Sequence, residues 1–169
     1  MRKLISILES INEFAGRLFS WSTIIMVILI CIEVILRYVF NRSLIWMVEL
    51  EIYLFAFSFL LAAGYAFKHD KHVRVDLFYS NFSVKKKAWV NFLGGILFLV
   101  PWCVVSIIGC VKYANISWRI GEVSQQPGGL PAVYLLKFSI VVGFVLLLIQ
   151  ATASILKSLL TIVTGKEIN

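Results

Sequence analysis

Charged side chains are scarce in this sequence. They make up 15 % of its 169 residues, whereas soluble domains usually contain about a quarter. Uncharged runs cover residues 18–32, 52–67, 88–111 and 138–156. A membrane-spanning helix needs about 20 mostly apolar residues, so these runs predict an integral membrane protein. The polar segments between the runs are too short to form a separate soluble domain.

Cysteine and histidine are also rare. The three cysteines all lie in the predicted spans, and an odd number of thiols at that depth argues against a disulfide framework. Their spacing does not match that of metal ligands. The two histidines, His69 and His72, lie in a polar segment, which argues against haem ligation between spans. We therefore expect no catalytic residue, cofactor or metal ion.

Acidic residues are outnumbered by basic ones, 9 to 16, and the net charge is +7. In a membrane protein this balance indicates cytoplasmic segments that face anionic lipid rather than binding to nucleic acid. Residues 68–87 hold six Lys or Arg, against one in residues 41–48 and two in residues 112–131. The positive-inside rule therefore places residues 68–87 and both termini in the cytoplasm. We expect three consecutive lysines to meet lipid phosphates: Lys85, Lys86 and Lys87.

The predicted fold is all-α, with a single transmembrane domain over residues 1–169. The four predicted spans cover about residues 18–40, 48–67, 88–113 and 132–163. Residues 3–16 carry apolar side chains at helical spacing, with polar residues on the other face. This amphipathic N-terminal segment either lies on the membrane surface or extends the first span.

Local signals mark where these helices end or bend. Asn41 tolerates a left-handed backbone and is expected to close the first helix. Ser43 is expected to cap the second helix. Pro101 lies inside the third span, where its missing N–H should cause a bend. Gly64, Gly94 and Gly95 permit close helix contacts, either within the chain or with a partner.

A polar corner separates the first two spans. Arg37 lies one turn before the end of the first helix, and Glu33 precedes it by four residues, a favourable order for a helical ion pair. Glu49, on the second helix, offers Arg37 an alternative partner. Trp46 is a suitable interfacial anchor. The corner is either a plain helix termination or a partner-docking surface formed by Arg37, Asn41, Trp46 and Glu49.

Residues 37–78 resemble the signature of the small membrane subunit of tripartite ATP-independent periplasmic (TRAP) transporters. The likeness rests on Arg37, Tyr38, Phe40, Asn41, Ser43, Trp46, Glu49, Leu54, Phe55, Gly64, Ala66, His72, Val75 and Asp76. The stretch "GGLPAVYLLKFSIVVGF" is similar to the last helix of that family through Leu130, Pro131, Tyr134, Gly143 and Phe144. The resemblance covers nearly the whole chain in length and order.

The sequence departs from this family pattern at a few positions. Val48 and Ile52 stand where the family often has an acidic and a basic residue. Glu51 is an additional acid, and Asp70 replaces a common glycine. These differences affect the local charge pairing more than the resemblance itself.

The resemblance implies a non-catalytic scaffold subunit in the bacterial inner membrane. Such a subunit is paired with a large membrane subunit that carries the sodium and substrate sites and moves as an elevator. A periplasmic binding protein delivers the solute, and Arg119 and Gln126 are candidates for contacting it, although their loop is equally consistent with a plain connector. The family transports organic acids such as sialic acids and C4-dicarboxylates, and general likeness favours the sialic-acid branch.

A small proton-coupled exporter is the alternative function. Such a protein uses a carboxylate within the membrane as its proton carrier, and Glu33 is the candidate. Two features argue against this alternative: Arg37 lies four residues from Glu33, and the loops of the chain are long.

Overall fold

The computed structural model describes residues 1–69, 79 and 82–165. Its described residues form helices and contain no strand, and four of the helical segments are long and apolar enough to cross a membrane. The all-α prediction is therefore confirmed. Part of the basic segment, including Lys71, His72, Arg74 and Asp76, lies outside the described residues, so expectations about it stay predictions.

Helix α1 runs without interruption over Arg2–Val39. The amphipathic segment and the first apolar run are thus one helix, which favours an extension of the first span over a separate surface helix. After α1, Asn41 adopts the expected left-handed backbone, with φ of 51°. The Arg42 N–H then donates a hydrogen bond to the Leu36 carbonyl at 3.0 Å, which turns the chain toward the second span.

The second span consists of α2 (Ile45–Leu61) and the short α3 (Ala63–Lys68). The expected cap at Ser43 is wrong: the N-cap residue is Leu44, and no side chain caps this helix start. An apolar residue thus holds the N-cap position, and α2 begins three residues earlier than predicted.

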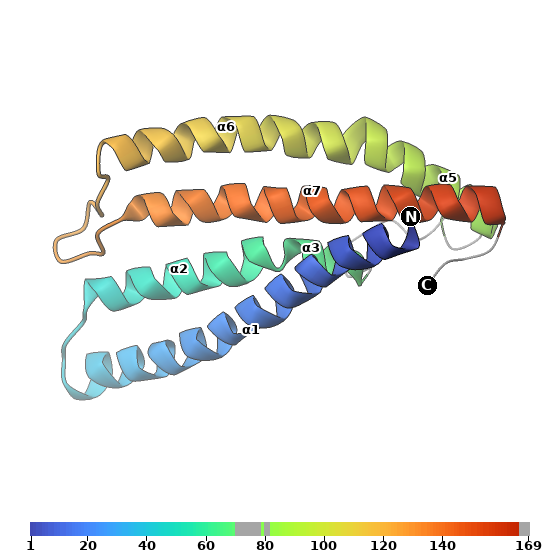
Figure 1. Ribbon diagram of the computed structural model, residues 1–169. Helices are drawn as coiled ribbons and strands as arrows, with labels where there is room; N and C mark the ends of the chain where they lie inside the picture. The colour runs from blue at the N-terminus through green and yellow to red at the C-terminus, as the bar shows by residue number, and fades with distance from the viewer. Residues whose placement is uncertain (70–78, 80–81, 166–169) are drawn as a thin grey trace.

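The third span bends near Pro101, as predicted. It begins with α5 (Val84–Gly94), continues through a π-helical turn, η1 (Gly95–Leu99), and ends with α6 (Val100–Arg119). Figure 1 shows the change of direction between α5 and α6. Pro101 lacks the N–H that a regular helix needs, and the wider π-helical turn lies directly before it.

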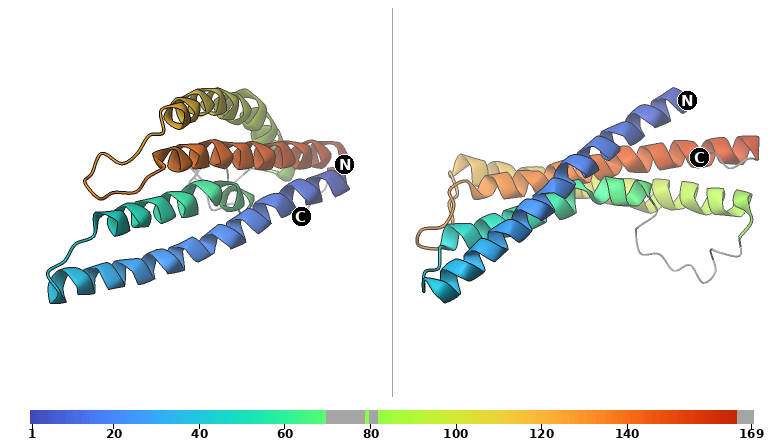
Figure 2. Two further views of the ribbon diagram at one scale, coloured as in Figure 1. Left: turned by 60° about the vertical axis from the view of Figure 1, so that its left-hand side comes forward. Right: turned by 90° about the horizontal axis from the view of Figure 1, so that it is seen from below.

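Helix α7 (Val133–Thr164) is the centre of the bundle and packs against each of the other helices that the structure describes. Figures 1 and 2 show α6 on one side of α7 and the α1–α2 hairpin on the other. Small residues allow this packing. A Cβ atom on Gly143 would come within 2.8 Å of the Leu60 carbonyl oxygen, so α2 and α7 approach closely only because residue 143 is glycine.

The bundle has two polar ends. The connections between α1 and α2 and between α6 and α7 lie together at one end, hereafter the loop end, which the charge pattern predicts to be periplasmic. The start of α1 and the end of α7 lie at the opposite end, hereafter the terminal end. Between them the surface is apolar, with exposed side chains such as Trp21 and Phe98, as a lipid-facing surface requires.

Candidate functional site

At the loop end, Arg37 is paired with Glu33 on its own helix. The Arg37 Nε and Nη2 atoms donate to Glu33 Oε1 at 2.9 and 2.5 Å. Glu33 is 5 % exposed, whereas the Arg37 side chain is about half exposed. This matches the expected four-residue ion pair and places the guanidinium where it can reach lipid headgroups. Glu49, which the sequence offered as an alternative partner of Arg37, forms its hydrogen bonds with Ser124 and Leu130 instead.

Glu49 connects the N-terminal part of α2 to the loop between α6 and α7. Its Oε1 atom accepts a hydrogen bond from the Ser124 hydroxyl, and its Oε2 atom accepts one from the Leu130 N–H at 2.5 Å. Sequence reasoning placed Glu49 in the corner but missed both partners. They are 75 and 81 residues away, and the sequence holds no signal for such a distant pairing.

The loop held by Glu49, residues 120–132, has a defined backbone. After α6, the Gly121 N–H donates to the Trp118 carbonyl and the Glu122 N–H to the Ser117 carbonyl, a Schellman motif. The Gly129 N–H donates to the Gln126 carbonyl, and Gly128 has φ of 79°, which are features of a type II turn with proline at its second position.

A second ion pair fixes the base of this loop. Lys137 Nζ lies 2.5 Å from Glu122 Oε2 and 3.9 Å from the centroid of the Tyr113 ring. The hydrogen bond from Lys137 lowers the pKa of Glu122, which lies in the loop beyond the spans. The Trp118 ring packs edge-on against Tyr134, with centroids 4.7 Å apart. These contacts join the ends of α6 and α7.

The other residues predicted at the loop end are exposed. Asn41, Trp46 and Arg119 lie on the surface. Gln126 is exposed at the loop tip, although its backbone N–H is bonded to the Ser124 hydroxyl at 3.0 Å. The structure therefore brings Glu49 and Gln126 into one hydrogen-bonded assembly through Ser124. It places Arg37 in a separate pair with Glu33.

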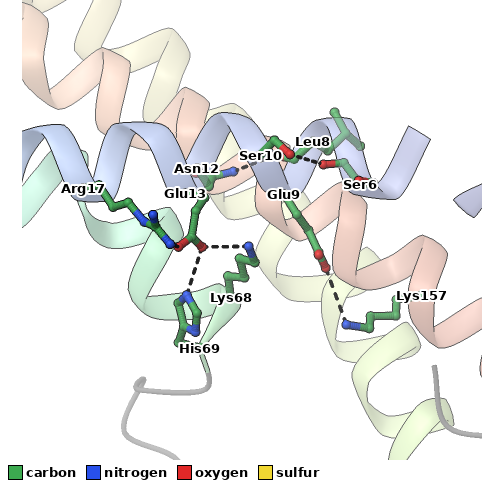
Figure 3. Close-up of polar contacts among 10 residues, drawn as sticks. All are labelled: Ser6, Leu8, Glu9, Ser10, Asn12, Glu13, Arg17, Lys68, His69 and Lys157. Atoms are coloured by element: carbon green, nitrogen blue, oxygen red, sulfur yellow. Dashed lines mark hydrogen bonds and ion pairs between the residues drawn. The ribbon is translucent and has the colours of Figure 1, made fainter. Parts of the chain in front are cut away.

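At the terminal end, the Glu13 carboxylate joins α1 to α3 (Figure 3). It accepts hydrogen bonds from Lys68 Nζ at 2.8 Å and from Arg17 Nε at 3.0 Å, and His69 Nε2 lies 3.1 Å away. Glu13 precedes the predicted first span. The bonds from Lys68 and His69 lower its pKa to about 2. A weaker contact of 3.5 Å links Glu9 to Lys157 on α7.

Two glycines at this end are in direct contact with larger side chains from a neighbouring helix. A Cβ atom on Gly16 would overlap the Tyr65 ring, and one on Gly64 would overlap the amide of Asn12. Asn12 is 0 % exposed. Gly64 therefore packs within the chain, as does Gly95, which lies against Ile155, whereas Gly94 has open space around it.

The three lysines predicted to meet lipid lie in the first turn of α5. Lys85 and Lys86 are exposed, and Lys87 lies over the Tyr79 ring, 5.4 Å from its centroid. The exposed Trp89 follows them within one turn. This arrangement suits a membrane interface, and contact with anionic lipid stays a prediction.

The structure shows no metal-binding arrangement over residues 1–69, 79 and 82–165: no three His, Cys, Asp or Glu side chains there are grouped to hold an ion. Cys103 is buried in α6, Cys110 is partly covered, and Cys31 is exposed on α1, all as free thiols. The chemically notable groups of the described chain are therefore the hydrogen-bonded assemblies at the two ends.

Comparison with known families matches residues 26–161 to tripartite ATP-independent periplasmic transporters, DctQ component. The chain belongs to this DctQ family. The match runs from the middle of α1 almost to the end of α7 and so includes part of the first span and nearly all of the other three. The family is a transporter component rather than an enzyme, and its assignment fits a multi-pass protein of the inner membrane.

A curated relative agrees with this assignment. The chain is 33 % identical over 69 residues to the C4-dicarboxylate TRAP transporter small permease protein DctQ of Vibrio cholerae. The matched region is 41 % of this chain and 28 % of the relative, so the chain spans less than a third of that relative's length in the alignment. No solved structure matches the chain.

Proposed function

We propose that this DctQ-family chain is the non-catalytic small permease subunit of a sodium-coupled TRAP transporter. In this proposal it forms a fixed scaffold for a large membrane subunit, which carries the solute and sodium ions. A periplasmic binding protein delivers the solute. Family membership supports the transporter role.

The Glu33–Arg37 pair is the observation that carries the passive role. Glu33 is the carboxylate that an exporter would use for proton coupling, but Arg37 donates two hydrogen bonds to it. A carrier acid must be free to exchange its proton with a transport pathway, whereas this carboxylate is held in an ion pair with a guanidinium on its own helix. The structure therefore offers no support for the exporter.

The solute proposed is an organic acid, either a sialic acid or a C4-dicarboxylate. General sequence likeness favours the sialic-acid branch, whereas the name of the Vibrio cholerae relative favours a C4-dicarboxylate. The large subunit would hold this solute. The small subunit would affect uptake through assembly and not through solute selectivity.

Three surfaces are proposed as contacts. The corner formed by Arg37, Asn41 and Trp46 docks the large subunit, and Glu49 holds the loop of residues 120–132 at the same end of the bundle. Arg119 and Gln126 contact the binding protein at the loop end, which we assign to the periplasm, with both termini in the cytoplasm. The first turn of α5 contacts anionic lipid through Lys85, Lys86 and Lys87.

Co-purification tests this proposal. The tagged chain is extracted in mild detergent from membranes that also contain the large subunit, and the accompanying proteins are identified by mass analysis. We expect a stable complex whose yield falls when Arg37 and Trp46 are both replaced by alanine. Isolation of the chain without a large membrane protein would overturn the scaffold assignment.

A further inference from the structure

The loop of residues 120–132 is held in place by a residue of α2 as well as by α6 and α7, the helices that flank it. Its backbone closes through the Ser124 N–H, which donates to the Leu130 carbonyl at 3.1 Å. Glu49 binds the same two residues from outside the loop, through the Ser124 hydroxyl and the Leu130 N–H. The Glu49 carboxylate thus connects both sides of the loop, at Ser124 and at Leu130, to the N-terminal part of α2.

Gly129 provides the space that this carboxylate needs. A Cβ atom at position 129 would lie 2.7 Å from Glu49 Oε1 and would also overlap the Ser124 side chain. Any larger residue would push the loop away from α2. The φ of Gly129 is not in the left-handed region, so the requirement for glycine here is one of space and not of backbone conformation.

The tip that this arrangement presents is exposed, polar and uncharged. It consists of Gln125, Gln126, Pro127 and Gly128, all on the surface. Figure 1 shows the loop extending beyond the ends of α6 and α7. Amide side chains on a fixed turn offer hydrogen bonds to a protein surface, and a loop already ordered loses less entropy on binding.

We propose that Glu49 is a positioning residue that holds this loop in the shape that docks the periplasmic binding protein. The inference rests on the proposed function, because it takes the binding protein as the partner at the loop end. It goes further by assigning the loop's shape to a carboxylate on α2. Lipid is a poorer partner, since the tip has neither the positive charge nor the apolar side chains that favour a membrane surface.

The test uses the complete transporter, with its large subunit and binding protein, in proteoliposomes. Glu49→Ala removes both hydrogen bonds, and Gly129→Ala disrupts the same contact without removing a charge. Glu49→Gln is the conservative variant, because its amide oxygen can accept from the Leu130 N–H while its NH₂ group donates to Ser124. Glu51→Ala is the matched control: it removes a carboxylate two residues along α2 that has no bond to the loop.

Hydrogen exchange of a peptide covering residues 120–132 reports the order of the loop. Initial uptake rates at increasing binding-protein concentration report docking. For Glu49→Ala and Gly129→Ala we expect exchange about tenfold faster or more. We also expect a severalfold higher KM for the loaded binding protein at unchanged kcat. Glu49→Gln and Glu51→Ala should stay close to the parent protein.

Two results would overturn the inference. Unchanged exchange in Glu49→Ala would show that the carboxylate does not hold the loop. Faster exchange with an unchanged KM would show that the loop's shape does not govern docking. Failure of the parent chain to bind the large subunit would instead reject the proposed function, and the exchange measurement on the chain would still decide whether Glu49 orders the loop.

Discussion

The Glu13 carboxylate on α1 lies 2.8 Å from the Lys68 ammonium group at the end of α3, 55 residues further along the chain. This bond and the neighbouring contact with His69 attach the N-terminal part of α1 to the second span. At the opposite end, the Glu49 contacts attach α2 to the loop between α6 and α7. The bundle is thus fastened by polar contacts at both ends.

The Glu13 contacts should depend on pH. Their effect is to lower the pKa of Glu13 from 4.5 to about 2. A carboxyl group with a lowered pKa stabilises the folded state above its unfolded pKa, and this contribution is lost as the pH falls through the folded value. We therefore predict that the unfolding temperature in detergent falls more steeply in the parent than in Glu13→Gln as the pH drops below about 4.5. Parallel curves for the two proteins would contradict this.

Gly16 should not tolerate a side chain. Gly16→Ala places a Cβ atom inside the Tyr65 ring, so we predict a loss of about 1–3 kcal/mol of stability, measured by thermal or denaturant unfolding in detergent. Gly109→Ala is the matched control, because nothing lies within 4 Å of that position. The control should be neutral or slightly stabilising, since alanine favours a helix over glycine. Equal losses in both variants would argue against the α1–α3 contact.

Removing one partner of the Glu33–Arg37 pair should destabilise the protein more than removing both. Arg37→Ala leaves a nearly buried carboxylate without its hydrogen-bond donor, whereas the double variant Glu33→Gln with Arg37→Gln leaves no charge. We predict that the single change lowers the unfolding temperature more than the double change, because an unpaired buried charge is costlier than a neutral pair. A double variant less stable than Arg37→Ala would contradict this prediction, because the Glu33 charge would then stabilise the protein even without its partner.

The sequence predicted the four spans, the left-handed Asn41, the bend near Pro101 and the Glu33–Arg37 pair. Each depends on residues close together in the chain, where hydropathy, backbone preference and helical spacing act directly. The third helix was predicted too short at both ends, because Lys85, Lys86 and Lys87 before the apolar run and the polar residues after Tyr113 end the run without ending the helix. Charged residues end an apolar run, from which a span is predicted, but lysine is a good helix former and does not end the helix.

The contacts that define the two ends were beyond prediction from one sequence. Glu49 binds Ser124 and Leu130, and Glu13 binds Lys68, only because tertiary packing brings segments distant in the sequence side by side. Local pattern places each carboxylate on a helix but does not select its partner. The expected cap at Ser43 failed because Leu44 holds the N-cap position of α2.

Reconstitution tests the central claim most directly. The purified chain is placed in liposomes either alone or with the large subunit and the loaded binding protein, and uptake of radiolabelled organic acid is measured under a sodium gradient. The scaffold account predicts no uptake above that of empty liposomes by the chain alone, and sodium-dependent uptake by the complete set. Accumulation of solute, or proton-driven export, by liposomes holding only this chain would contradict it.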